Sequence, residues 1–437
     1  MMSRAAVSSQ VRQGLGRHTL SGLSFWMLVG KGLQMGGGFL FWVVAARAAD
    51  VVDVGIAAAS VAGIMLCTQI GVVGAGSAVI ISFARKDQAR EHVLDIAFTL
   101  VLLASLVTGT VYLIVASALG SDAVSRSNPG GLVMLFLLST VAGTANICLD
   151  QISIALSWAG SSSVRYATGG MVALAGIGVA AGLAGPLSAT DLLGYWALGS
   201  VFSCVVGAIQ LGKRLGYRYH LTLHTGSLVR FLGVGLPNQV LTLTERVPSL
   251  LVPVIIAHIA SPAMTAYWYP AWMLAWIAYS APIMVGMVQF SDGVRNPERL
   301  RASVRTSVKW SLFLGGSIAV VLGAAAGPIL QLMGDEYASA SVNAVRILGI
   351  GLIPYAVVQA YNAVCRAQGR TTEGIILGTA VGVCICLATA LLAREGTAYL
   401  AISWVSISSL GATLALWRLR VRLRPADAAA HKSGGLA

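Results

Sequence analysis

FLGVGLPNQVLTLTERVPSLLVPVIIAHIASPAMTAYWYPAWMLAWIAY, residues 231–279, is apolar over most of its length, yet Glu245 and Arg246 stand side by side in its first half. An ionised group at bilayer depth is costly, so it usually faces protein or a water-filled cavity. Three prolines fall in the same helix: Pro237, Pro248 and Pro253. Because proline tends to kink or break a helix, the stretch predicts an interrupted membrane helix with one wet face.

The polar side chains of this helix follow helical spacing, so they are expected to form a single stripe: Asn238, Thr242, Glu245, Arg246 and Ser249. Such a stripe can line a cavity, or it can join the helix to its neighbours through hydrogen bonds. Both interpretations stay open at this point.

The composition of the whole chain is that of a membrane protein. Of its 437 residues, 57% are hydrophobic and 10% are charged, whereas a soluble domain has about 45–50% apolar and about 25% charged residues. The six cysteines all fall inside apolar runs and have no metal-ligand spacing with histidine. We therefore expect no metal site and no cofactor.

A membrane span needs about 20 mostly apolar residues, and twelve stretches meet that criterion. They are about 21–46, 54–83, 93–119, 131–157, 166–186, 191–211, 229–257, 263–290, 303–326, 342–365, 372–393 and 396–417. The predicted fold is an all-α polytopic membrane protein. Its predicted parts are an N-terminal tail (1–20), a first set of six helices (21–212), a linker (213–227), a second set of six (228–418) and a basic C-terminal tail (419–437).

The distribution of lysine and arginine predicts the orientation. With both termini in the cytoplasm, most of the basic residues fall in inside segments, with Arg165 and Arg366 counted among them. The outside segments hold only Arg47, Arg126, Arg346 and Arg394. The net charge of +13 is thus mainly a topology signal that adds attraction to anionic lipid, and nucleic acid is not an expected partner.

Three stretches carry a resemblance to a known family. They are Ala46-Arg47 with Gly55 and IGVVG at 70–74, the 233–256 segment, and residues 328–370 with Gly334, Tyr337 and Ala338. On these residues, the chain resembles the polysaccharide or oligosaccharide flippases of the multidrug/oligosaccharidyl-lipid/polysaccharide (MOP) exporter superfamily. It departs from the family where Ala48-Ala49-Asp50 replaces the usual Leu-Gly-Pro.

The resemblance implies twelve helices in two bundles of six around a central cavity that opens alternately to each side of the cytoplasmic membrane. It implies a lipid-linked saccharide as substrate, carried on a polyprenyl diphosphate. It also suggests association with a polysaccharide polymerase or with glycosyltransferases.

The candidate substrate-binding residues are cations, polar groups and aromatic rings in the predicted spans: Lys31, Gln34, Asn238, Thr242, Arg246, Trp272 and Trp276. Fixed cations in a partly dehydrated cavity would hold a diphosphate, and aromatic faces can stack on sugar rings. For Lys31 the alternative is snorkelling to the interface, and for the tryptophans it is packing against lipid or protein.

Two acids in the spans, Glu245 and Asp150, are candidates for coupling transport to an ion. Glu245 would otherwise partly neutralise Arg246, although adjacent residues on a helix point about 100° apart, which argues against a direct pair. The alternative function is a drug/cation antiporter of the same superfamily. No constellation of catalytic residues is found, so we do not expect an enzyme.

Overall fold

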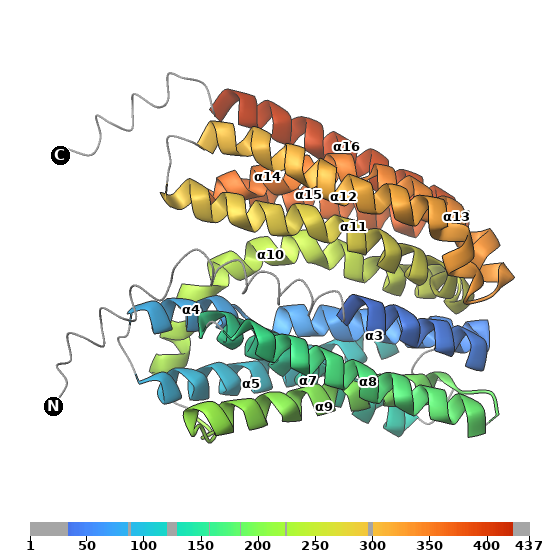
Figure 1. The fold of residues 1–437 in the computed structure, drawn as a ribbon, viewed down its shortest axis with the longest axis horizontal. Helices are drawn as coiled ribbons and strands as arrows, with labels where there is room; N and C mark the ends of the chain where they lie inside the picture. The colour runs from blue at the N-terminus through green and yellow to red at the C-terminus, as the bar shows by residue number, and fades with distance from the viewer. Residues whose placement is uncertain are drawn as a thin grey trace.

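The structure is a computed structural model that describes residues 34–85, 89–119, 129–156, 158–183, 185–222, 225–295 and 300–422. The described residues are almost entirely helical and form two bundles that lie side by side (Figure 1). The first bundle contains a helix over 34–48, then α3 (Val51–Gly71), α4 (Ala75–Arg85), α5 (Arg90–Ala118), α7 (Pro129–Ala155), α8 (Ala159–Leu183) and α9 (Ala189–Leu215).

The second bundle begins with three helices of 35, 34 and 32 residues. It contains α10 (Thr225–Ile259), α11 (Pro262–Arg295), α12 (Leu300–Gln331), α13 (Asp335–Ile350), α14 (Leu352–Ala367), α15 (Thr371–Leu392) and α16 (Thr397–Arg422). The two bundles meet where α3 and α4 pack against α10 and α11. Two of these helices, α10 and α11, contain the 231–279 stretch on which the sequence analysis rests.

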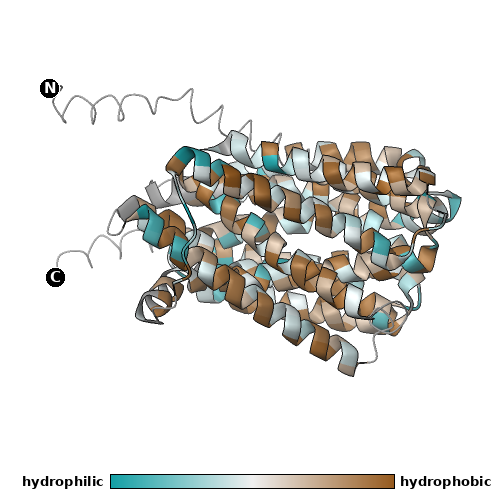
Figure 2. Cartoon of the chain, turned by 90° about the horizontal axis from the view of Figure 1, so that it is seen from below, coloured by the Kyte–Doolittle hydropathy of each residue, from teal (hydrophilic) through white to brown (hydrophobic). Residues whose placement is uncertain are grey.

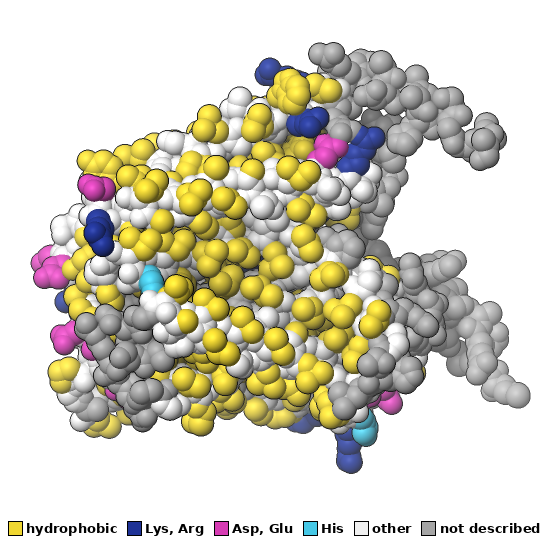
Figure 3. All heavy atoms as spheres, turned by 180° about the vertical axis from the view of Figure 1, so that it is seen from behind, with side chains coloured by type: hydrophobic (Ala, Val, Ile, Leu, Met, Phe, Trp, Pro, Cys, Tyr) yellow, Lys and Arg dark blue, Asp and Glu magenta, His cyan; other side chains and the backbone are white. Residues whose placement is uncertain are grey.

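Within the described residues, 10 helices are long and apolar enough to cross a membrane, or up to 11 if the bent pair α13–α14 is one span. Polar residues gather toward the two ends of the bundles (Figure 2). On the face seen in Figure 3, the charged side chains also lie at the ends, with an apolar surface between them. The all-helical, two-bundle membrane fold predicted from the sequence is therefore confirmed. The count of twelve stays a prediction, since part of span 21–46 lies outside the described residues.

The proline-rich helix is not broken, because α10 is one continuous helix of 35 residues, although its first part is inclined to the rest (Figure 1). A proline removes a single backbone donor, and close packing can hold the helix together around it. The ring of Pro248 packs on Gly382 of α15, where an added Cβ would lie 2.6 Å from the Pro248 Cγ atom. Breaks between consecutive helices fall after Gly71, between α3 and α4, and, with a bend of 44°, between α13 and α14.

The turn between α3 and α4 touches α10 directly. Gly74 has a φ of 79°, a left-handed conformation that favours glycine. A Cβ built at Gly74 would lie 2.4 Å from the carbonyl carbon of Gly235. Because neither Gly74 nor Gly235 carries a Cβ atom, the backbones of the two bundles can come this close at the seam.

The segment that follows α9 is tied to the first bundle. The hydroxyl of Tyr217 and the backbone N–H of His220 both donate to Asp95 Oδ1 on α5, at 2.8 and 2.9 Å, and the N–H of Thr222 donates to Thr99 Oγ1 at 3.2 Å. Burial, followed by the bond to Asp95, raises the pKa of Tyr217, so its hydroxyl remains a donor at neutral pH. Residues 217–222 thus form a strap across α5.

We predict that this strap lies on the cytoplasmic side. A single cysteine placed at the exposed Arg218, in a protein without native cysteines, should be blocked only by reagents that cross the membrane. A cysteine at the exposed Glu395, between α15 and α16, should react with an impermeant maleimide added from outside. The reverse labelling pattern would show that the orientation is inverted.

Candidate functional site

Helices α10 and α14 bring together an acid, an amide and an arginine. Asn362 Nδ2 and Arg366 Nη2 both donate to Glu245 Oε1, at 2.9 and 3.1 Å. The four-residue spacing of Asn362 and Arg366 puts both on one face of α14. The side chains of Arg366 and Glu245 are 16% and 11% exposed, so the ion pair lies largely within the protein.

Arg246 points elsewhere. Its guanidinium lies over the ring of Trp276 on α11, with the Cζ atom 5.8 Å from the ring centroid, which is a cation–π contact. Among the described residues, Arg246 forms no ion pair with a carboxylate. The expectation that adjacent residues on a helix do not pair therefore holds here, and Glu245 finds its partner on another helix. We call Glu245, Arg246, Asn362 and Arg366 the polar cluster.

The polar cluster has an excess of positive charge. An arginine guanidinium stays protonated in proteins, and the cluster holds two of them against one carboxylate. Arg366 is bonded to Glu245, whereas the Arg246 guanidinium lies over the Trp276 ring and forms no ion pair with a carboxylate of the described residues. An arginine presented in this way can bind phosphate or carboxylate oxygens with two parallel hydrogen bonds.

The two predicted binding tryptophans of α11, Trp272 and Trp276, contact each other, with ring centroids 5.7 Å apart, but differ in their other neighbours. Trp276 contacts both Arg246 and Tyr355, whose ring centroid is 6.5 Å away. Trp272 is 7% exposed and packs on Trp404 of α16 at 4.5 Å, inside the second bundle. The structure therefore joins Trp276 to the polar cluster and places Trp272 in the aromatic core behind it.

The remaining predicted binding residues are only partly placed. Lys31 and the side chain of Asn238 lie outside the described residues. Gln34 is exposed where the described helix begins. Thr242 is partly exposed one turn before Arg246, and this spacing puts the two on the same face of α10. Whether Lys31 lies across from Arg246 stays a prediction.

The second predicted ion-coupling acid, Asp150 of α7, is in the first bundle and is already paired. Arg165 Nη2 of α8 donates to Asp150 Oδ1 at 2.5 Å, and the hydroxyl of Tyr166 donates to the other carboxylate oxygen. Arg165 is only 1% exposed. The structure thus brings Asp150 together with two donors from the next helix and separates it from the polar cluster.

Two arginines counted with the cytoplasmic loops lie instead within helices. Arg165 is buried in α8, and Arg366 is in the last turn of α14. Both fall at the edge of an apolar run, where hydropathy does not determine whether a residue belongs to the helix or to the loop. The signal that could have found them is the repeated spacing of Asn146 with Asp150 and of Asn362 with Arg366, which marks one polar helix face in each half.

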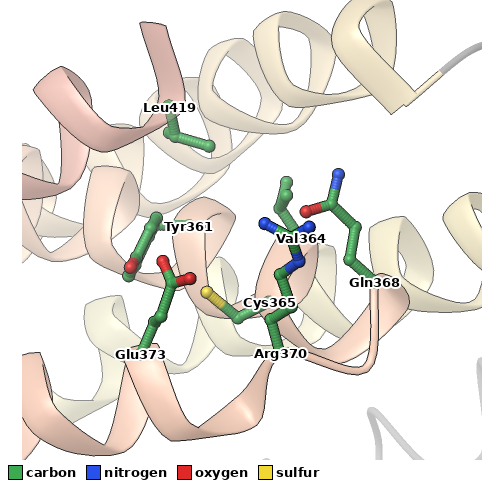
Figure 4. A pocket seen from close by; sticks show the side chains of 7 residues that line it. All are labelled: Tyr361, Val364, Cys365, Gln368, Arg370, Glu373 and Leu419. Carbon is green, nitrogen blue, oxygen red and sulfur yellow. The ribbon is translucent and has the colours of Figure 1, made fainter. Parts of the chain in front are cut away.

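A small pocket lies near the end of the second bundle, between α14, α15 and α16. Figure 4 shows the side chains of Tyr361, Cys365 and Glu373 pointing toward one another there. No member of the polar cluster and no predicted binding residue lines this pocket. It is therefore separate from the candidate site.

Comparisons with known proteins identify structures with a similar fold. Residues 243–390 match the family model described as MatE. A multidrug resistance MATE family transporter of the MOP superfamily, in its inward-facing conformation, is 15% identical, with a TM-score of 0.70 over 91% of this chain and 98% of that chain. The lipid II flippase MurJ, in an inward closed conformation, is 13% identical, with a TM-score of 0.71 over 90% and 87%. The chain has the MOP superfamily fold.

A third structure with the MOP fold is a transporter from Pyrococcus furiosus, for which a binding pocket of reverse polarity is described. It is 15% identical to this chain, with a TM-score of 0.58 over 92% of this chain and 95% of that chain. None of the curated proteins matches the sequence significantly. At identities this low, the comparisons show that the fold is shared. They do not transfer the substrate of any of these proteins to this chain.

Proposed function

We propose that the protein is a flippase that moves a lipid-linked oligosaccharide or polysaccharide precursor across the cytoplasmic membrane by alternating access. The observation that carries this proposal is the excess positive charge of the polar cluster, with Arg246 held over Trp276 and without a carboxylate partner among the described residues. Both termini lie in the cytoplasm, and polysaccharide polymerases or glycosyltransferases supply and use the substrate beside it.

The chemistry of the substrate fits this cluster. A polyprenyl diphosphate is a multiply charged anion, and arginine is suited to bidentate recognition of phosphate. Arg246 contacts the diphosphate first, and Arg366 gives a second cation one helix away. Lys31 and Gln34 are the predicted further contacts from the first bundle. The likeness of the fold to the lipid II flippase MurJ supports a lipid-linked cargo.

The second candidate is a drug/cation antiporter, supported by the likeness to MATE family transporters and by the two acids within the helices. A cationic drug or a coupling ion needs a carboxylate that can receive it. Glu245 is bonded to Arg366 and Asp150 to Arg165. A cation would therefore have to displace an arginine at either acid, which makes this function the less favoured one.

Proteoliposomes separate the two candidates. Purified protein should accelerate the flipping of a fluorescent polyprenyl-diphosphate oligosaccharide, followed by the fraction that a membrane-impermeant quencher reaches. A control lipid with the same chain and sugar but without phosphates should flip at the rate of empty liposomes. Accumulation of ethidium driven by a proton or sodium gradient, without lipid flipping, would overturn the flippase and favour the antiporter.

A further inference from the structure

The side chain of Arg47 joins the two bundles at the end away from the strap. Its Nε and Nη2 atoms donate to the backbone carbonyls of Leu332 and Gln331, both at 2.8 Å. Arg47 lies in the last turn of the helix over 34–48 in the first bundle, whereas Gln331 ends α12 in the second and Leu332 follows it. The last carbonyls of a helix lack intrahelical partners and carry partial negative charge, so a guanidinium is well suited to bind them.

Two further contacts close the same end of the seam. The imidazole Nε2 of His258, at the end of α10, donates to the carbonyl of Leu119, at the end of α5, at 2.7 Å. At the start of α3, a Cβ built on Gly55 would lie 1.8 Å from the carbonyl oxygen of Pro262, which opens α11. We call the end of the molecule that carries these contacts the distal end, and it is the end predicted to face outside.

We propose that Arg47 is a latch that holds the distal ends of the two bundles together, and that it releases when the protein opens outward. The inference rests on the alternating access in the proposed function, but it does not depend on which substrate is carried. The latch is chemically suited to this task because its acceptors are backbone carbonyls. Once Arg47 leaves, water can satisfy both the exposed guanidinium and the helix end, so neither state leaves a buried charge unpaired.

The chain provides a matched control for this contact. Arg394 is also exposed and also donates its Nε to a carbonyl at a helix end, that of Ile259, at 3.1 Å. Arg394 follows α15 and Ile259 ends α10, so this bond lies entirely within the second bundle. Removing Arg394 deletes the same kind of contact without removing a hydrogen bond between the two bundles.

The test measures the separation of the bundles at the distal end in purified protein. Nitroxide labels at Leu183→Cys, at the end of α8, and Leu391→Cys, at the end of α15, are placed in a protein without native cysteines. These side chains are 85% and 81% exposed. Pulsed electron–electron distance measurements then report the populations of closed and open distal ends. Arg47→Ala should raise the ratio of open to closed protein about fivefold, as expected for losing two exposed charge-assisted bonds.

The Arg394→Ala variant should keep the distance distribution of the unsubstituted protein. Arg47→Gln, which keeps a shorter neutral donor, should give an intermediate distribution and serves as the measured variant if Arg47→Ala does not fold. An unchanged distribution in the measured Arg47 variant, or an equal shift in Arg394→Ala, would overturn the latch. The distance measurement uses no substrate, so a negative flippase assay would not contradict the latch. A negative distance measurement, in turn, would not contradict the proposed flippase function.

Discussion

Replacing Arg246 by alanine is expected to reduce flipping of a diphosphate-linked lipid about 10- to 100-fold, with nearly normal amounts of folded protein. A hydrogen bond to a charged group contributes about 1.5–3 kcal/mol, and each 1.4 kcal/mol is about tenfold in affinity. The protein itself should tolerate the change, because the Arg246 guanidinium rests on the Trp276 ring rather than on a buried carboxylate. Initial flipping rates in proteoliposomes, normalised to reconstituted protein, measure the effect.

Three further variants make this prediction specific. Arg246→Lys should retain part of the activity, because the charge survives although the planar fork does not. Trp276→Leu removes the ring that positions the guanidinium and should also lower activity in part. Arg305→Ala, at an exposed arginine of α12, should be silent. If Arg246→Ala instead lowers the melting temperature and the yield of folded protein together with transport, Arg246 has a structural role.

The second large effect is expected at the ion pair between Glu245 and Arg366. Changing Arg366 to glutamine leaves a largely buried carboxylate without its cation, and loss of one member of a buried pair destabilises a protein by about 3–5 kcal/mol. The double variant Glu245→Gln, Arg366→Gln keeps hydrogen-bonding groups without a charge and should recover most of that loss. Thermal unfolding in detergent, carried through the complete double-mutant cycle, measures the coupling.

The same cycle at Glu245 and Arg246 is the comparison, since these adjacent residues form no ion pair with each other in the described part of the chain. Their coupling energy should be clearly smaller than that of Glu245 and Arg366. A strong coupling at Glu245 and Arg246 together with none at Glu245 and Arg366 would contradict the arrangement of the polar cluster. Recovery of transport as well as stability in the Glu245→Gln, Arg366→Gln variant would show that Arg366 does not contact substrate.

Hydropathy and charge were enough to predict the helices and the division into halves, because burial in lipid imposes a long apolar run on every span. The position of Glu245 within α10 was also visible, since a carboxylate stands out against so apolar a background. Its partner was not visible. Arg366 lies more than a hundred residues further along the chain, and the contact depends on the rotation of α14 about its axis, which no local pattern determines.

The sequence was least informative where backbone groups are the partners. Arg47 was identified as part of a family-like motif and as one of few outside cations, yet nothing in its surroundings indicates that it binds the end of α12. Because every residue has a backbone carbonyl, the residue types in the sequence do not show which carbonyl accepts a hydrogen bond. The prolines of α10 could not decide between a kink and a break for a related reason, because continuity of a helix depends on what packs around it as well as on its own donors.

The strap over α5 also determines where the first moving body ends. Because residues 217–222 are fastened to Asp95 and Thr99, they travel with the first bundle whenever it tilts. The first moving body therefore extends beyond the end of α9 and includes the strap. A gene divided into two co-expressed halves should accordingly keep residues 217–222 with the first half.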